Sequence, residues 1–329
     1  MTQLCGKGIW LAHSYDLQRA AEMATRIGGT HVLVKVGHGP HYFPDTTREM
    51  VQRVRALGLY PLAWVKLTAR APQEARTAIV AALERGYEAV VLVLNPEAGA
   101  GPITGAQMQP LVQALINVEI PRQRLFLASP PLSYLSDRTA VEVLVQVCQG
   151  GWFPLCFAAW AESPTEVIDQ GVYHGLGDLS LIWEGTPEVY PVLSAHYGLN
   201  DEALMPESFI PWVEGIARHG VDFFSVYDAA GTEKALWSML EAINVACLET
   251  DGRVPVSVSD NRRAVPNASG QVPQPIYITV RTSDSVWGII SRHGISREQF
   301  WAWNAHLWDS RGLPRDPDYL QEGWRLRVK

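Results

Sequence analysis

The sequence lacks long hydrophobic runs, an excess of positive charge and closely spaced cysteines. No apolar stretch among its 329 residues reaches the roughly 18 residues that a membrane-spanning helix needs. The formal net charge is −7, whereas a nucleic-acid-binding surface is basic, so we predict neither a membrane span nor a nucleic-acid partner. Met1–Trp10 lacks the basic and apolar segments of a secretory signal, which predicts synthesis in the cytoplasm without a signal peptide.

Metal and cofactor motifs are also absent. The four cysteines, Cys5, Cys148, Cys156 and Cys247, form no CxxC pair and no cluster with histidine, so no metal site is predicted. Cys148 and Cys156 lie in apolar surroundings, which is typical of buried thiols and agrees with synthesis in a reducing compartment. No glycine-rich phosphate-binding turn follows the first apolar run, and we predict no cofactor.

Apolar runs alternate with amphipathic stretches over the first 245 residues. The runs are rich in Val, Leu, Ile and Phe without polar alternation, as in parallel strands that are buried on both faces. Eight such runs, each followed by a helical pattern, predict an α/β fold, a (β/α)₈ TIM barrel, and an open doubly wound sheet is the alternative. The predicted strands are 8–13, 31–37, 60–67, 89–94, 124–129, 153–160, 189–196 and 222–227.

A change of composition separates this region from the C-terminus. Residues 251–275 are rich in Pro, Ser, Asn and Gly and have no periodicity, which is typical of a linker. We therefore predict a barrel over residues 1–250, a linker over 251–275 and a small module over 276–329.

Active sites of TIM barrels lie at the C-terminal ends of the strands, so polar residues there are candidates. Glu97 ends a strongly apolar strand, where partial burial would raise the pKa of its carboxyl and suit it to act as a general acid. Asp16 and Asp228 follow the first and eighth strands, which are neighbours in a closed barrel, so either one is a candidate second carboxylate. Asp16 has an alternative role as the N-cap of the helix that begins at Leu17. The candidate substrate-binding residues at the same end are Asn95, His13, Trp64, Trp160, His196 and Tyr227.

The C-terminal module begins with Tyr277–Ile290, which reads as a strand, a polar turn and a helix with an apolar–Trp pair. A second helix is predicted to start at Ser296, and Leu320–Val328 reads as a turn and a final strand. This βααβ pattern resembles the LysM domain, whose groove binds glycans that contain N-acetylglucosamine. The resemblance places the groove at Thr282, Ser283, Asp284, Ser285, Asn304 and Leu320.

Two features of the module depart from the LysM pattern. Ser283 stands where the family has a glycine in the turn, and the segment Ala305–Tyr319 is longer than usual. Because the longer segment rebuilds one wall of the groove, its ligand specificity differs from the common one in our interpretation. A role in docking to protein is the alternative.

The first 245 residues resemble TIM-barrel glycoside hydrolases of the muramidase (lysozyme-like) type. The resemblance rests on His13–Asp16, on Asn95-Pro96-Glu97 and on the strand Phe224–Tyr227. Asn95 replaces an aspartate of that family. The resemblance implies a phage-like lysin or related enzyme that acts at the cell wall on peptidoglycan or a chitin-type N-acetylhexosamine polymer and is targeted by the LysM module.

Two alternatives to hydrolysis stay open at the level of sequence. The first is a non-catalytic, glycan-binding or structural component of a cell-surface or phage-tail-like assembly, in which a degenerate barrel meets protein partners within a particle. The second is a barrel enzyme for another small substrate, with Lys35 or Lys66 as its reactive group.

Overall fold

The computed structural model describes residues 4–69, 72–94, 102–161, 163–194, 205–243, 245, 277–280, 297–304, 307 and 324–328. The chain divides into two compact units, Met1–Val256 and Ser257–Lys329. Within the described residues, no helix is both long and apolar enough to cross a membrane.

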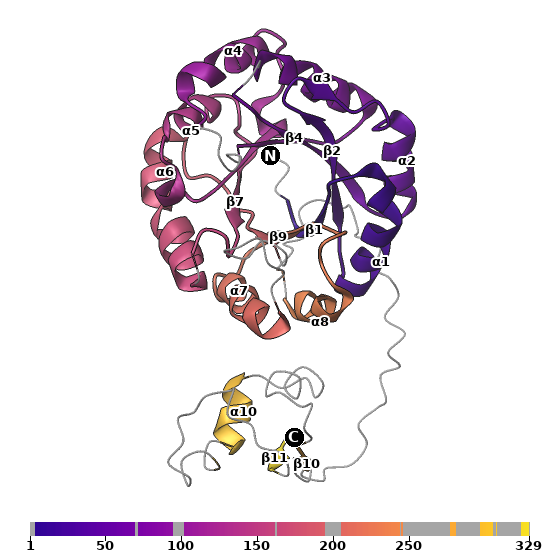
Figure 1. Ribbon diagram of the computed structural model, residues 1–329, viewed down its shortest axis with the longest axis vertical. Helices are drawn as coiled ribbons and strands as arrows, with labels where there is room; N and C mark the ends of the chain where they lie inside the picture. The colour runs from indigo at the N-terminus through magenta and orange to yellow at the C-terminus, as the bar shows by residue number, and fades with distance from the viewer. Residues whose placement is uncertain are drawn as a thin grey trace. The chain divides into compact units, whose positions relative to one another are not determined.

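The first unit is a closed barrel of eight parallel strands, as the sequence predicts (Figure 1). The first strand closes the ring because it pairs with both the second strand, at Gly8–His31, and the last, at Gly6–Phe223. The barrel strands are β1 (Gly6–Leu11), β2 (His31–His38), β4 (Tyr60–Lys66), β5 (Val90–Val93), β6 (Leu125–Ser129), β7 (Trp152–Cys156), β8 (Val192–Ser194) and β9 (Phe223–Tyr227).

Helices surround this ring (Figure 1). They are α1 (Leu17–Ile27), α2 (Arg48–Ala56), α3 (Ala75–Arg85), α4 (Gly105–Ile116), α5 (Thr139–Leu144), α6 (Leu176–Ile182), α7 (Pro206–Arg218) and α8 (Lys234–Ala242). Two elements differ from the sequence prediction. A short strand β3 (His41–Tyr42) pairs antiparallel with β2, and Thr165–His174 forms a π-helix where an α-helix was expected.

The helix boundaries follow from local chemistry. Thr47 accepts a hydrogen bond from the backbone N–H of Met50 at the start of α2, and Thr104 forms a capping box with Gln107 at the start of α4. Gly28 and Gly86 end α1 and α3 in the left-handed conformation, with φ of 69° and 98°. Glycine adopts this conformation without steric cost, which is why these two residues can end their helices.

The interior of the barrel is filled by large aromatic side chains. Trp10, Trp64, Phe153 and Phe223 each have at most 2% of their surface exposed. The rings of Trp10 and Phe153 meet edge to face, with centroids 6.1 Å apart, as do those of Phe153 and Phe223 at 5.9 Å. A Cβ atom at Gly8 would lie 2.7 Å from Phe223, so the aromatic filling needs a residue without a side chain there. A second apolar cluster joins the outer faces of the strands to the helices.

Lys7 connects the first strand to the last helix. Its Nζ donates hydrogen bonds to the backbone oxygens of Leu240 and Glu241, at 2.8 and 3.0 Å. A cation is favourable there because the oxygens at a helix C-terminus carry partial negative charge. Burial lowers the pKa of the Lys7 ammonium to about 8, and the Glu241 charge partly opposes this.

The described cysteines include both free thiols and a disulfide-bonded residue. Cys148 and Cys156 are buried free thiols, as predicted, and burial raises the pKa of each thiol. Cys5, at the start of β1, is instead disulfide-bonded. Disulfides persist in oxidising environments, so this bond does not fit the reducing compartment that the sequence suggested.

The second unit contains β10 (Tyr277–Thr279), α10 (Arg297–Asn304) and β11 (Arg325–Arg327). β10 and β11 pair antiparallel, with Ile278 opposite Leu326. The buried side chains of Val280, Phe300, Trp324 and Leu326 provide its apolar core. Trp324 therefore has a packing role, in keeping with the few large side chains from which a small module builds its core.

Acid is expected to destabilise the barrel through His31. Burial lowers the pKa of its imidazole to about 3, and the ring packs against Tyr60 and Phe223. Below pH ~6.5 the unfolded chain binds a proton that the folded chain does not, so about 1.4 kcal/mol of unfolding free energy is lost per pH unit. Urea unfolding at pH 7 and pH 5 measures this loss, about 2 kcal/mol over the interval.

His31→Phe keeps a ring in place and is expected to reduce this acid dependence. His174 is exposed and serves as the matched control, since His174→Gln leaves the buried imidazole unchanged. An acid dependence that survives in His31→Phe would assign the effect to another group.

Candidate functional site

The C-terminal ends of the barrel strands and the loops that follow them form one end of the barrel, which we call the mouth. A row of aromatic side chains crosses it: Tyr134, Trp160, Phe157, Tyr227 and Trp64. Their successive ring centroids are 6.5, 6.4, 6.1 and 6.0 Å apart. The row links loops after β6 and β7 to the ends of β7 and β9 and to β4, so residues distant in sequence share one surface.

Exposure divides the predicted aromatic residues into two groups. Trp160 and Tyr227 are half-buried, and their rings reach the surface of the mouth. Trp64 is only 2% exposed, and its Nε1 donates to the backbone oxygen of Leu11 at 3.0 Å. It supports the mouth from below, next to Trp10, which the sequence analysis did not single out. Trp10 donates to Ser225 Oγ at 2.8 Å. The sequence gave no sign that Trp10 supports the mouth, because it simply stands between two apolar residues of a strand.

Asp16 and Asp228 lie close enough for their charges to interact, as expected for loops after neighbouring strands. Asp228 is buried, and its Oδ1 accepts a hydrogen bond from the backbone N–H of Gly231 at 2.7 Å. The backbone oxygen of Asp228 accepts from both the N–H and the hydroxyl of Thr232. These contacts hold the Asp228 carboxylate in a fixed turn.

The environment of Asp16 makes ionisation of its carboxyl less favourable than in water. Burial raises the pKa of its carboxyl, the Asp228 charge raises it further, and His13 and Arg19 oppose the shift. Asp16 Oδ2 is buried and has no hydrogen-bond partner among the described residues. Asp16 occupies the N-cap position of α1, as the alternative predicts, but its side chain makes no capping hydrogen bond there.

Arg19 attaches α1 to the loop after β9. Its guanidinium donates to the backbone oxygens of Ala229 and Thr232. These bonds fix the loop that carries Asp228 relative to the helix that follows Asp16, so the two carboxylates are held by one network.

His13 is exposed and stacks on Tyr15, with ring centroids 4.9 Å apart and an interplanar angle of 5°. Tyr15 is 77% exposed, and it was not among the predicted substrate-binding residues. Lys35, one of the two lysines predicted as an alternative reactive group, has its Nζ over the Trp64 ring, 4.9 Å from the centroid. This contact gives Lys35 a place in the aromatic packing beneath the mouth.

Several predicted residues lie outside the described part of the chain. In the barrel these are Glu97, Asn95 and His196, and in the module they are Thr282, Ser283, Asp284, Ser285 and Leu320. Among described residues, no three His, Cys, Asp or Glu side chains come together in a way that would hold a metal ion.

Asn304 is the predicted groove residue of the module that the structure describes. It is 1% exposed, and its amide nitrogen donates to the backbone oxygens of Phe300 and Arg327, at 2.9 and 3.0 Å. Its Oδ1 accepts from the N–H of Arg327 at 2.8 Å. Both amide hydrogens are thus engaged, so Asn304 connects α10 to β11.

Comparison with known proteins identifies the C-terminal module. Residues 278–329 match the family model of the LysM domain, and this part of the chain is a LysM domain. No curated protein matches the chain by sequence.

The barrel is similar in fold to chitinase structures. The catalytic domain of the hyperthermophilic chitinase from Pyrococcus furiosus aligns with a TM-score of 0.53 and 12% identity, over 72% of this chain and 93% of that one. The spore cortex-lytic enzyme SleL of Bacillus cereus aligns with a TM-score of 0.49 and 8% identity, over 74% and 75%. At such identities the likeness concerns the fold alone. The chain is thus a TIM barrel, similar in fold to these structures, joined to a LysM domain.

Proposed function

We propose that the protein binds cell-wall glycan containing N-acetylglucosamine through its LysM domain and hydrolyses the same polymer at the mouth of the barrel. The observation that carries this proposal is the mouth itself, where half-buried aromatic rings lie at the same end of the barrel as the carboxyl groups of Asp16 and Asp228. The chitinase-like fold and the LysM domain support it, because LysM domains bind N-acetylglucosamine glycans and the similar barrels are named as chitinases.

The chemistry needs one acid and one second carboxylate. Trp160 and Tyr227 offer ring faces on which pyranose rings stack. Glu97, assigned from sequence, would protonate the glycosidic oxygen as the bond to the anomeric carbon breaks. Asp16 or Asp228 would stabilise the positive charge at that carbon or activate the water that attacks it. The water supplies the hydroxyl of one product, and its proton returns to the carboxyl groups.

A second candidate is a non-catalytic glycan-binding barrel within an assembly of proteins. The specific observation in its favour lies in the sequence, where Asn95 stands at the position of an aspartate in muramidase-type barrels, so one carboxylate of that type is missing. Asp228 is also committed to its turn through the Gly231 N–H. A barrel of this kind would hold glycan or a partner protein without cleaving a bond.

The place of action follows from the same features. We expect the protein to act at the cell wall or in a particle that meets it, where the polymer is found. The disulfide at Cys5 suits an environment outside the reducing cytoplasm.

Release of reducing ends from purified peptidoglycan and from chitin tests the proposal. The wild-type chain is expected to release them, and Glu97→Gln is expected to reduce the rate by about 10²–10⁴-fold, because an amide cannot donate the proton. Glu142 is exposed on α5, so Glu142→Gln is the matched control and retains full activity.

Binding to the same insoluble polymers separates the two candidates. Sedimentation of wild-type protein with peptidoglycan but no release of reducing ends favours the non-catalytic barrel. Hydrolysis that survives Glu97→Gln would show that another residue is the acid.

A further inference from the structure

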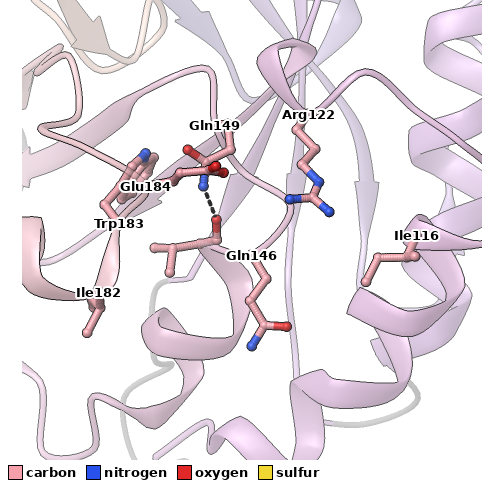
Figure 2. A pocket seen from close by; sticks show the side chains of 8 residues that line it. Ile116, Arg122, Gln146, Gln149, Ile182, Trp183 and Glu184 are labelled. Carbon is pink, nitrogen blue, oxygen red and sulfur yellow. Dashed lines mark hydrogen bonds between the residues drawn. The ribbon is translucent and has the colours of Figure 1, made fainter.

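A hollow of about 390 Å³ opens on the barrel far from the mouth (Figure 2). Its walls come from the end of α4, from the segment between α5 and β7 and from the end of α6. These segments lead into β6, β7 and β8, so the hollow lies at the N-terminal ends of the strands, whereas the mouth lies at their C-terminal ends. Nothing in the proposed hydrolysis uses it.

Part of the lining is apolar. Ile116, at the end of α4, is 41% exposed, and Ile182 and Trp183 line the wall from α6 (Figure 2). Leu181, one residue before Ile182, is 85% exposed. Trp183 itself is only 6% exposed, so Ile116 and Ile182 supply most of the apolar surface of the hollow. Exposed aliphatic side chains that border a hollow are typical of binding surfaces.

The rest of the lining is polar and largely unengaged. Arg122, Gln146 and Glu184 are exposed side chains that line the hollow, and in the described part of the chain no hydrogen bond or ion pair engages any of the three (Figure 2). Gln149 differs, because its amide donates to the backbone oxygen of Val145. One guanidinium, one free amide and one carboxylate therefore border a single hollow.

A second hollow of about 220 Å³ continues the first. The two share Ile116 and Arg122, and the second adds Ile120 and Glu119. The joined surface has room for more than one small ring, and it again mixes aliphatic side chains with single charges of opposite sign.

The lining restricts the class of ligand. An anion such as a phosphate would face Glu119 and Glu184 with only Arg122 to balance them. A wholly apolar ligand would leave three polar groups without partners. Planar amide, guanidinium and carboxylate groups each match neighbouring hydroxyls in pairs, and the aliphatic side chains of Ile116 and Ile182 match the C–H faces of a pyranose. We propose that this hollow is a second saccharide-binding site, which takes one or two sugar rings of a neutral glycan.

A second site would change how the protein holds a polymer. This consequence rests on the proposed function, because it takes the bound glycan to be the one that the mouth and the LysM domain engage. Linked sites on one polymer bind more tightly than either site alone, since the second contact forms at a high effective concentration. The protein would remain attached to glycan while the mouth releases its products.

Hydrogen–deuterium exchange of the full chain with chitotetraose locates the site directly. Slower exchange is expected in peptides covering residues 116–122, 145–149 and 182–184, besides any change in the LysM domain. The chitotetraose concentration that gives half-maximal protection of these peptides measures the dissociation constant of the site. In the double variant Arg122→Ala and Gln146→Ala, this dissociation constant is expected to rise about tenfold, because two side-chain hydrogen bonds are lost. Both residues are exposed, so the fold is retained.

The control is the double variant Arg76→Ala and Gln52→Ala, which removes the same side-chain types from exposed positions on α3 and α2. It should leave the protection unchanged. Unchanged exchange in the three peptides at saturating chitotetraose overturns the inference, as does protection that Arg122→Ala and Gln146→Ala does not weaken. A failure of the proposed function is separate, because it shows as unprotected peptides at the mouth and no release of reducing ends.

Discussion

Replacing Asp16 by asparagine is expected to make the barrel more stable and less active at once. At neutral pH the folded chain holds a carboxylate whose pKa is raised by burial and by the charge of Asp228, so its ionised form is disfavoured there. Asp16→Asn removes that charge and is expected to add up to ~1 kcal/mol to the unfolding free energy. The same change removes a carboxylate of the proposed site, so hydrolysis is expected to fall by about 10²-fold or more.

The pH dependence gives this prediction its sign. A carboxyl whose pKa is raised by folding binds protons more readily in the folded state than in the unfolded state. Its ionised form therefore lowers the unfolding free energy at neutral pH, and this loss disappears as the pH falls through the unfolded pKa of ~3.9. The stability gain of Asp16→Asn is therefore expected at pH 7 and not at pH 3. Thermal unfolding at the two values measures it, and release of reducing ends measures activity.

Asp137 supplies the contrasting control. It is an aspartate whose pKa is lowered by hydrogen bonds from the hydroxyl and the backbone N–H of Thr139. Asp137→Asn is expected to reduce stability and leave hydrolysis unchanged. A loss of stability in Asp16→Asn would contradict the account of its burial, and a stable variant with full activity would remove Asp16 from the proposed mechanism.

Trp10→Ala is expected to be the most damaging single change in the barrel interior. The side chain is 1% exposed and contacts the rings of Trp64, Phe153 and Tyr227. Its removal leaves a large cavity where the interior is rigidly packed, at a cost of about 3–5 kcal/mol in unfolding free energy. Urea unfolding followed by circular dichroism of the full chain measures the loss.

Trp10→Phe distinguishes the packing of the ring from the hydrogen bond that its Nε1–H donates. It retains much of the packing but leaves the hydroxyl of Ser225 without the Nε1–H bond of 2.8 Å, so a smaller loss of about 1–3 kcal/mol is expected. Tryptophan at this position also supports Tyr227, and both variants are expected to weaken glycan binding at the mouth. Trp10→Ala with the stability of wild type would show that the interior repacks.

The barrel was predictable because its signal is repetitive. Eight apolar runs such as Val90–Val93 have no polar alternation, and glycines such as Gly28 and Gly86 end the helices between them. The short strand His41–Tyr42 and the π-helix Thr165–His174 were not predictable, because each depends on contacts with the rest of the barrel rather than on a periodic pattern.

The candidate site was predictable in outline only. Asp16 and Asp228 follow neighbouring strands of a closed ring, so their proximity followed from the fold class alone. Sequence alone did not decide between a cap and an acid for Asp16, and the structure places it at the N-cap position of α1 without a side-chain capping bond. Trp64 was a candidate for stacking on sugar, but alternation along β4 turns it inward, where it is buried.

The sequence by itself determined the order of elements and the LysM domain and predicted the parallel barrel, because periodicity, glycines at helix ends and a short motif are local properties of a chain. The pairing of β1 with both β2 and β9 decided that the sheet is closed. Tertiary structure decided which side chains reach the surface. Trp160 and Tyr227 lie at the mouth while Trp10 and Trp64 lie beneath it, and Asn304 uses its amide inside the module. Exposure of one residue depends on neighbours that are far apart in the sequence, and only the folded chain brings them together.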